Sequence, residues 1–168
     1  MRLVVVGSAP VAEHVVTVLR LALGCSVLES YGLTECAAPC CLSLPGDLEP
    51  GHVGPPLACN TIKLTDLPDM EYFASHSKGE ICIRGTNVFQ GYFKDEERTL
   101  RTIDEEGWLH TGDIGEWTAW GTLRVIDKIK TVFKLANGDY VDPDRLEAVY
   151  VQSPYINQVR QNCEEGEP

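Results

Sequence analysis

The N-terminal stretch contains an apolar run followed by a helical pattern. Residues 2–7 (Arg-Leu-Val-Val-Val-Gly) are rich in β-branched residues without alternation, which predicts a buried strand of a parallel sheet. A turn at residues 7–10 leads into a helix, because Pro10 suits a first helical turn and Gly24 suits a helix end. The apolar face of this helix comprises Val11, Val15, Val18, Leu19 and Ala22. A second strand begins at residues 26–28, so the order strand, helix, strand predicts a βαβ unit with parallel strands.

Short strand patterns and turns dominate the middle of the chain. Residues 42–56 contain repeated pairs of proline and glycine, which indicate a crossing rich in turns. Two stretches alternate apolar and polar residues, 61–65 and 80–84, as is typical of strands with one exposed face, and the polar stretch between them predicts a loop. A short helix is expected at residues 94–103, because acidic residues occupy its first turn. Strand patterns on both sides of residues 118–121 complete a small antiparallel β subdomain.

Charged residues replace the strand pattern after Asp127, and a turn is expected at residues 137–138. Asp142 and Pro143 predict the start of a helix, with Asp142 as its N-cap. The apolar face of this helix comprises Leu146, Val149 and Tyr150. The whole pattern predicts an α/β protein, in which a parallel βαβ unit precedes an antiparallel β subdomain and a further helix.

Composition narrows the classes of partner. The chain has 168 residues, enough for one domain or one and a part, and its 43% apolar and 23% charged residues are typical of a folded globular protein. The net charge of −11 and the pI near 4.7 argue against nucleic acid or an anionic membrane surface as a partner. No apolar run approaches the roughly 18 residues of a membrane span.

Cysteine and histidine add little chemistry at this level. The seven cysteines include the adjacent Cys40 and Cys41, and their spacing offers no paired C-x-x-C pattern for zinc. We interpret them as reduced thiols of an intracellular protein rather than as a disulfide framework, and Cys40 and Cys41 as packed thiols rather than a redox pair. Two histidines inside motifs, His52 and His110, are expected to orient backbone. The pattern gives the other two, His14 and His76, no metal partner.

Two loops at the carboxyl ends of the parallel strands are candidates for a binding site, because functional groups of such sheets gather there. One loop is Gly7-Ser8-Ala9-Pro10, and the other contains Tyr31-Gly32-Leu33-Thr34-Glu35. A tyrosine ring can lie on a nucleobase, Gly32 allows close approach of the backbone, the Thr34 hydroxyl can bind a phosphate oxygen, and Glu35 can hold Mg²⁺. The alternatives are a strand-to-helix turn that needs small residues for the first loop, and a surface turn with a packed tyrosine for the second.

The stretch from Gly107 to Gly115 supplies a third candidate. Its two glycines can both take positive φ, and Asp113 directly follows a third glycine. A carboxylate fixed there could accept hydrogen bonds from the two adjacent hydroxyls of a ribose. The alternative is a tight turn in which Asp113 caps its own backbone.

The order of these and other motifs resembles that of the adenylate-forming, or AMP-binding, synthetases. The motifs are Gly7–Pro10, Tyr31–Glu35, Gly51–Pro55, Gly79–Gly85, Gly91–Tyr92, Gly107–Asp113 and Ile126–Lys130. Within that superfamily the chain looks most like the long-chain fatty acid–CoA ligases, through Cys59–Leu64, Asn87–Tyr92, Gly121–Leu123 and Phe133–Gly138. The resemblance covers residues 2 to about 158, nearly the whole chain.

The resemblance implies a fold, a reaction and roles for individual residues. Residues 1–127 would be the C-terminal portion of the AMP-binding large domain, and residues 128–168 the hinge and the start of the C-terminal lid. The reaction would join a fatty acid to CoA through an acyl-adenylate, with ATP and Mg²⁺. Residues with implied roles are Gly7, Ser8, Ala9 and Pro10 (adenine pocket), Tyr31 and Gly32 (adenine), Thr34 (phosphate), Glu35 (Mg²⁺), Asp113 (ribose), and Asp127 to Lys130 (hinge).

The chain also departs from the family pattern. Lys128 stands where the family has an arginine that reaches the ribose, and a lysine offers a point charge in place of a planar fork. The family's Ser/Thr/Gly-rich phosphate loop, its acyl tunnel and its adenylation lysine have no counterpart here, and residues 160–168 are polar and acidic. The chain is therefore expected to be a fragment that does not catalyse adenylation alone.

Three functional interpretations follow. The chain is a segment of a ligase, a truncated and non-catalytic nucleotide-binding or interaction module, or a plain α/β structural domain that would require every ordered motif to be coincidence. The resemblance further implies a parent at the endoplasmic reticulum or mitochondrial outer membrane, facing the cytosol. Such ligases attach to the membrane through an N-terminal segment that is missing here.

Overall fold

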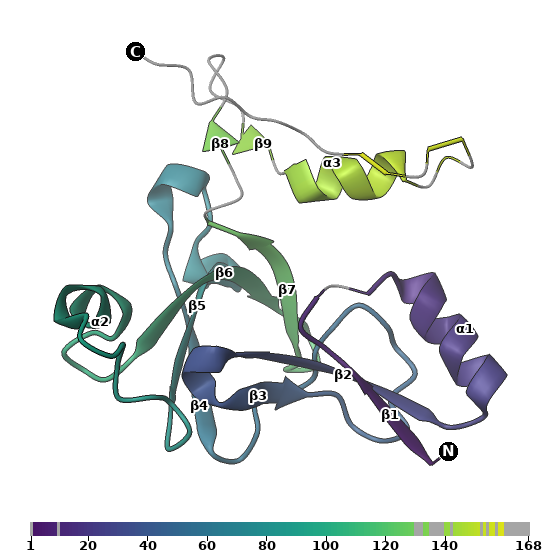
Figure 1. Cartoon of the computed structure of the whole chain (residues 1–168), viewed down its shortest axis with the longest axis horizontal. Helices are drawn as coiled ribbons and strands as arrows, with labels where there is room; N and C mark the ends of the chain where they lie inside the picture. Colours follow the sequence, from purple (N-terminus) through teal and green to yellow (C-terminus); the bar gives the residue numbers. More distant parts are fainter. Residues whose placement is uncertain are drawn as a thin grey trace. The chain divides into compact units, whose positions relative to one another are not determined.

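The computed structural model describes residues 2–9, 11–129, 133–134, 140–141, 143–151, 153, 155–156 and 158–159. The chain divides into two compact units, Met1–Ile126 and Asp127–Pro168, each of which is described by itself below (Figure 1).

The first unit begins with the predicted βαβ unit. Strand β1 (Leu3–Val6) pairs in parallel with β2 (Ser26–Leu33), and helix α1 (Glu13–Leu23) connects them (Figure 1). Gly24 ends the helix in the left-handed conformation, and its N–H donates to the carbonyl oxygen of Arg20. The parallel pairing and the glycine cap confirm the prediction from the apolar pattern.

The packing predicted for this unit was partly wrong. Leu3 and Val5, which share one face of β1, are about half exposed, and β1 is the edge strand of a three-stranded sheet. Within α1, Val16 is the buried residue, whereas Val15 and Val18 of the predicted apolar face are exposed. The helix begins at Glu13 rather than at Pro10, and Pro10 lies outside the described residues. The apolar periodicity identifies the helix, but it does not say which side another element covers.

Strand β2 is longer than its apolar pattern indicates. Residues 31–33, expected in a loop, continue the strand and pair antiparallel with β3 (Ala38–Leu42), and only the short 3₁₀ helix η1 (Thr34–Cys36) makes the turn. The pairing is irregular between Tyr31 and Gly32. Burial of β3 explains the extension, because Cys40 and Cys41 are fully buried and the Cys40 thiol donates to the carbonyl oxygen of Tyr31.

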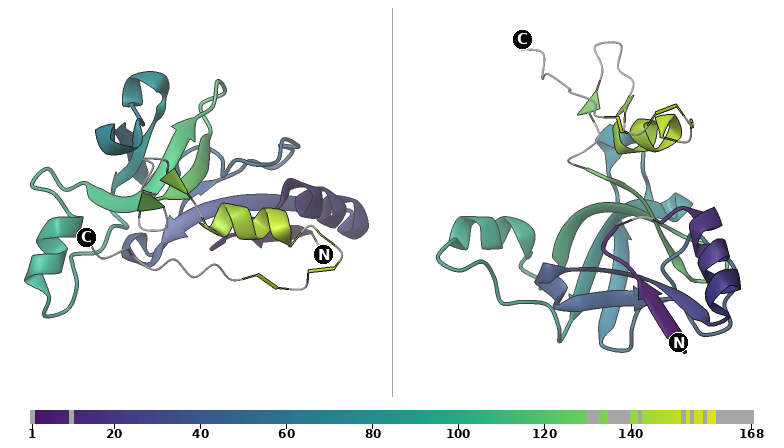
Figure 2. Two further views of the ribbon diagram at one scale, coloured as in Figure 1. Left: turned by 90° about the horizontal axis from the view of Figure 1, so that it is seen from above. Right: turned by 45° about the vertical axis from the view of Figure 1, so that its right-hand side comes forward.

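The antiparallel β subdomain is confirmed as a four-stranded sheet in the order β4-β5-β6-β7. Its strands are β4 (Asn60–Thr65), β5 (Lys78–Gly85), β6 (Leu109–Trp117) and β7 (Leu123–Lys128), and β6 and β7 are visibly curved (Figure 2). The predicted polar loop contains the short helices η2 (Pro68–Met70) and η3 (Ala74–His76). The predicted short helix is α2 (Glu96–Thr102), and its N-cap Asp95 accepts a hydrogen bond from the Arg98 N–H.

One hydrophobic core joins the two sheets of this unit. Its buried members are Tyr31, Cys36, Cys40, Cys41, Leu64, Ile81, Ile83, Leu109 and Leu123. The turn-rich crossing also contacts the second sheet through two backbone hydrogen bonds. The Val53 N–H donates to the carbonyl oxygen of Leu123, and the Leu123 N–H donates to the carbonyl oxygen of Gly54. The cysteines within the described residues are free thiols, and the burial of Cys40 and Cys41 confirms that they are packed rather than a redox pair.

The second unit contains a short antiparallel pair, β8 (Phe133–Lys134) and β9 (Tyr140–Val141), and helix α3 (Pro143–Tyr150). The helix lies where the sequence predicts it, but the proposed N-cap Asp142 is outside the described residues. Val149 and Tyr150 of its expected apolar face are exposed. In the part of the chain that the structure describes, no helix is long and apolar enough to cross a membrane.

The crossing generates a prediction about stability. Gly54 has φ +82°, and a Cβ there would lie 2.1 Å from the Leu42 carbonyl oxygen, whereas Gly46 has φ +90° and open space around it. We expect Gly46→Ala to lower the free energy of unfolding by about 1–2 kcal/mol through backbone strain alone. Gly54→Ala should lower the free energy of unfolding by more than about 4 kcal/mol, because the backbone at Leu42 must also move to make room for the new Cβ. Urea denaturation of both variants checks this, and equal losses would contradict it.

Candidate functional site

The loop after β1 lies against the end of β2. A Cβ at Gly7 would lie 2.3 Å from the Ser30 hydroxyl oxygen, which itself donates a hydrogen bond to the Val6 carbonyl oxygen at 3.1 Å. Ser8 has φ +72°, an uncommon conformation for a residue with a side chain, and Ser8 and Ala9 are exposed. The structure therefore brings Gly7 beside the residue that precedes Tyr31, as the parallel pairing predicts.

Tyr31 and Asp113 meet although they are 82 residues apart in the sequence. The Tyr31 hydroxyl donates to Oδ2 of Asp113 at 2.7 Å, and both side chains are buried, with 9% and 3% exposed. Burial, and then the neighbouring carboxylate, raise the pKa of Tyr31 well above its ordinary value. The phenol therefore remains a protonated donor to the carboxylate, a charge-assisted hydrogen bond in a buried setting.

Asp113 lies within strand β6, not in a tight turn. Of the two glycines expected to take positive φ, Gly107 does (+79°) but Gly115 does not, and Gly112 does instead (+71°). The interpretation of Asp113 as a cap of its own turn was therefore wrong. The β5–β6 register shifts between Glu80 and Cys82, so residues 111–113 form an irregularity in the ladder. Bulges of this kind re-aim a side chain, and here the strand directs the carboxylate toward Tyr31.

Hydrogen bonds hold the irregular segment of β6 in place. The Asp113 N–H donates to the Thr111 hydroxyl, which donates to the carbonyl oxygen of Ile81 at 2.8 Å. The Gly112 N–H donates to Oε1 of Glu80 at 3.1 Å. The side chains of Thr111 and Glu80 thus replace the backbone pairing that the register shift removes.

Thr34 and Glu35 occupy the 3₁₀ turn that follows β2. Thr34 is exposed and Glu35 is half-buried. The Tyr92 hydroxyl donates to Oε1 of Glu35 at 2.7 Å, and the Phe89 N–H donates to the Glu35 carbonyl oxygen at 2.8 Å. The Asn87 side-chain amide donates to the Cys36 carbonyl oxygen. The segment from Asn87 to Tyr92 therefore braces the turn that carries Glu35.

Sequence reasoning missed the role of Tyr92. Its pKa is raised, through desolvation and then through the bond to Glu35, and the Arg98 guanidinium lies over its ring at 3.9 Å. The available signal was the pair Gly91-Tyr92, which the motif pattern singled out without a function. Nothing in the sequence indicates that this segment folds back over Glu35.

For the remaining predicted site residues the structure gives few contacts. Gly32 lies in β2 opposite Pro39. Asp127 and Lys128 belong to the second unit, where the Lys128 N–H donates to Oδ1 of Asp127, and Lys130 lies outside the described residues. The hinge and the ribose contact of Lys128 stay predictions.

Two histidines make specific contacts. His52 is buried, its Nδ1 accepts the Gly54 N–H at 3.0 Å, and its Nε2 lies 3.1 Å from Oδ2 of Asp47. These contacts confirm that His52 orients the backbone of the crossing. His110 instead contacts two carboxylates. Its Nδ1 lies 2.9 Å from Oε2 of Glu80, and its Nε2 lies 3.5 Å from Oδ2 of Asp104.

The first unit can therefore present a buried carboxylate next to a tyrosine, and a braced carboxylate in a neighbouring turn. A carboxylate has about four acceptor sites, enough to accept from a phenol and from sugar hydroxyls together. A single half-buried carboxylate in a turn suits a Mg²⁺ ion that takes its other ligands from water and phosphate.

Comparison with known proteins gives consistent matches. Residues 1–93 match the AMP-binding enzyme family. The chain is 53% identical over 158 residues to the human protein named long-chain-fatty-acid–CoA ligase 1, covering 94% of this chain and 23% of that one. The chain thus spans about a quarter of the length of this relative.

Two solved structures are similar in fold. The adenylation domain of a carboxylate reductase from Mycobacterium chelonae has a TM-score of 0.74 at 33% identity, covering 92% of this chain and 23% of that one. An o-succinylbenzoate coenzyme A synthetase from Bacillus subtilis, in complex with ATP and a magnesium ion, has a TM-score of 0.78 at 28% identity. The match covers 94% of this chain and 32% of that one. The expected fold, part of an adenylation domain, is confirmed.

The Tyr31–Asp113 bond generates a prediction about pH. Because the folded pKa of Tyr31 is raised above the unfolded value of about 10, the stability that the phenol contributes is present below about pH 10 and is lost as the pH rises further. We expect Tyr31→Phe to lower the free energy of unfolding by about 1.5–3 kcal/mol near neutral pH, and by less above pH 10. Chemical denaturation across pH checks this, with Tyr155→Phe, at a 94% exposed residue, as control. If the difference in free energy of unfolding between the wild type and Tyr31→Phe stays constant with pH, the prediction is wrong.

Proposed function

Because this chain belongs to the AMP-binding enzyme family, we propose that it is the nucleotide-binding segment of a long-chain fatty acid–CoA ligase. The 53% identity to the human ligase supports the substrate class, since the match extends over 94% of this chain. The parent reaction is a fatty acid plus ATP giving acyl-AMP and pyrophosphate, followed by attack of the CoA thiol to give acyl-CoA and AMP.

The contact between Tyr31 and Asp113 carries the proposal. A nucleotide needs one group against its base and one on its ribose hydroxyls, and these two side chains lie within hydrogen-bond distance of each other, at 2.7 Å. The ribose hydroxyls would donate to the Asp113 carboxylate as the Tyr31 phenol does. Gly7, Ser8 and Ala9 follow the neighbouring strand, and Gly7 lies close to Ser30, a position from which they would form one wall of an adenine pocket.

Glu35 is the residue that fits a metal ion bound to the triphosphate. Its carboxylate is half-buried, and Tyr92 orients it through Oε1. The exposed Thr34 hydroxyl beside it suits a phosphate oxygen. Mg²⁺ held there by Glu35 supplies positive charge that offsets the repulsion between the phosphates and the attacking carboxylate. The chain's own contribution is to fix the direction of the Glu35 carboxylate.

The segment alone is expected to lack the complete reaction. It spans 23% of the length of the human relative, and Leu3 and Val5 at the edge of its first sheet are about half exposed, as in a part of a larger domain.

The resemblance alone supports three further parts of the proposal: CoA as co-substrate, the fatty acid as substrate, and a cytosol-facing membrane location of the parent. Lys128 in place of arginine weakens one ribose contact, because a single ammonium cannot form a bidentate fork.

Nucleotide binding by the first unit tests the proposed roles. We expect AMP to bind the purified chain, and Asp113→Asn to weaken binding about 10–100-fold, the range for a hydrogen bond to a charged group. Isothermal calorimetry measures both, with Glu105→Gln, at an exposed residue near β6, as the unaffected control.

A ribose analogue makes that measurement specific. 2′,3′-Dideoxy-AMP should bind the wild-type chain more weakly than AMP does, and the Asp113→Asn variant should not distinguish the two nucleotides. If the variant still prefers AMP as strongly as the wild type, Asp113 does not hold the ribose.

Catalysis by the isolated chain is tested separately. We expect no ATP–pyrophosphate exchange with palmitate above background, because loss of even one group that stabilises developing charge costs about 10²–10³ in rate. A full-length long-chain ligase serves as the positive control. Exchange that depends on palmitate and on the 168-residue chain would overturn this expectation.

A further inference from the structure

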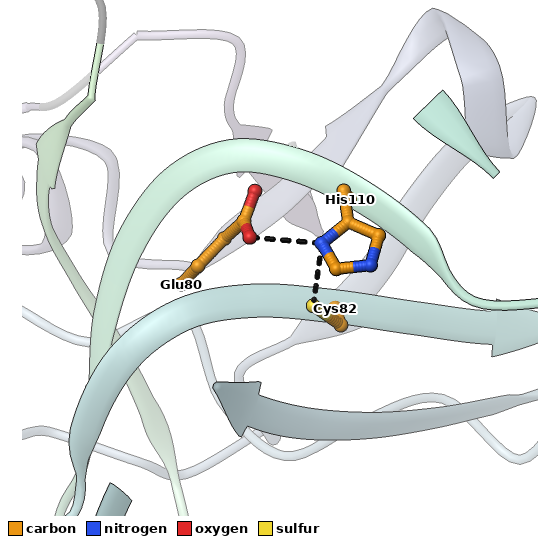
Figure 3. A group of neighbouring side chains, drawn as sticks. All are labelled: Glu80, Cys82 and His110. Atoms are coloured by element: carbon orange, nitrogen blue, oxygen red, sulfur yellow. Dashed lines mark hydrogen bonds and ion pairs between the residues drawn. The ribbon is translucent and has the colours of Figure 1, made fainter. Parts of the chain in front are cut away.

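Three potential metal ligands come together on the sheet surface between β5 and β6. Oε2 of Glu80 lies 2.9 Å from Nδ1 of His110, and Sγ of Cys82 lies 3.5 Å from the same nitrogen. The ligand atoms all lie within 4.8 Å of one another. Figure 3 shows the three side chains pointing toward a common centre from the two neighbouring strands. Cys82 and His110 are register partners, so the sheet itself fixes their proximity.

We propose that Glu80, Cys82 and His110 bind a zinc-class divalent cation. A thiolate, an imidazole and a carboxylate together form a donor set that Zn²⁺ favours. With bonds of about 2.3 Å to sulfur and about 2.0–2.1 Å to nitrogen and oxygen, a tetrahedral ion holds its N and S ligands about 3.5 Å apart and its N and O ligands about 3.4 Å apart. The observed N–S distance of 3.5 Å already matches, and the Glu80 oxygen has to withdraw from the imidazole nitrogen by roughly half an ångström.

The surroundings of the three ligands match those of a metal site. Oδ2 of Asp104 lies 3.5 Å from Nε2 of His110, the position from which a carboxylate accepts the second N–H of a metal-bound imidazole. Oε1 of Glu80 accepts the Gly112 N–H, and the Thr65 hydroxyl lies 3.5 Å from the Cys82 sulfur. Each proposed ligand thus has an outer contact that fixes its orientation. A water molecule would complete the tetrahedron.

Charge and access also favour a cation. The Cys82 sulfur lies 3.5 Å from the His110 imidazole, the negative charges of Glu80 and Asp104 act on the thiol, and the positive charge of Lys63 on β4 acts in the opposite sense. Cys82 is fully buried, but the His110 side chain is 33% exposed, so an ion can enter from that side. A cysteine binds the ion as its thiolate, so binding at neutral pH must release the thiol proton to the solvent.

The proposed site is separate from the Mg²⁺ position proposed at Glu35. Its ligands lie on β5 and β6, whereas Glu35 follows β2. In a simpler arrangement Glu80 and His110 only brace the two strands through their hydrogen bond, and no ion binds. The two arrangements differ in whether the Cys82 sulfur becomes a ligand.

Cobalt(II), a spectroscopic substitute for zinc, tests this directly. We expect one equivalent of Co²⁺ to give the near-ultraviolet thiolate-to-cobalt charge-transfer band and Zn²⁺ to abolish that band by displacement. Cys82→Ser should remove the band, whereas Cys59→Ser, at an exposed free cysteine, should leave it unchanged. Asp104→Asn should lower the affinity of the chain for Zn²⁺ about 10–100-fold, as measured by competition with a chromophoric chelator.

Several outcomes would overturn the proposal. Absence of the band in the wild-type chain at one equivalent, or persistence of the band in Cys82→Ser, is such an outcome. If circular dichroism shows that Cys82→Ser does not fold, Glu80→Gln and His110→Gln decide, because both retain the thiol; unchanged Co²⁺ spectra and Zn²⁺ affinities in both would exclude the site. The titration contains no nucleotide, so its result is independent of the proposed ligase function.

Discussion

The hydrogen bond from Tyr31 to Asp113 is the contact on which the candidate site depends. It joins β2 of the first sheet to β6 of the second, and both side chains are buried at the shared core. A buried carboxylate is tolerated only with a strong donor beside it, because desolvation of an unpaired charge costs several kcal/mol, on the order of the stability of a whole domain. Tyr31 supplies that donor, so packing of the two sheets and formation of the candidate site depend on the same contact.

Backbone irregularity places both members of this pair. The β2–β3 register shifts at Tyr31 and Gly32, and the β5–β6 register shifts opposite residues 111–113. A regular strand would alternate its side chains strictly between the two faces, so a one-residue change in register moves a side chain to the other face. The two shifts accompany the placement of this polar pair beside a largely apolar core.

The sequence predicted the parts of the fold that depend on local pattern. Gly24 as a helix end, the short acidic-led helix now seen as α2 and the strands at residues 61–65 and 80–84 follow from neighbouring residues, and each was confirmed. The extension of β2 through Leu33 and the bond from Tyr92 to Glu35 were not predictable in this way. They depend on residues far apart in the chain, and no periodicity records which distant segment will cover a given turn. The ordered motifs indicated the candidate site residues, but not what holds them in position.

Glu80 links the candidate nucleotide site to the second cluster of ligands. One of its oxygens contacts Nδ1 of His110 and the other accepts the N–H of Gly112, the residue before Asp113. A cation that draws the first oxygen away from His110 therefore also changes the support of the strand that aims Asp113. Coupling of this kind is reciprocal, since any effect of the cation on ribose binding must equal the effect of the nucleotide on cation binding. Because both oxygens of Glu80 are engaged, a shift of its carboxylate toward a cation would also alter the hydrogen bond that the Gly112 N–H donates to it.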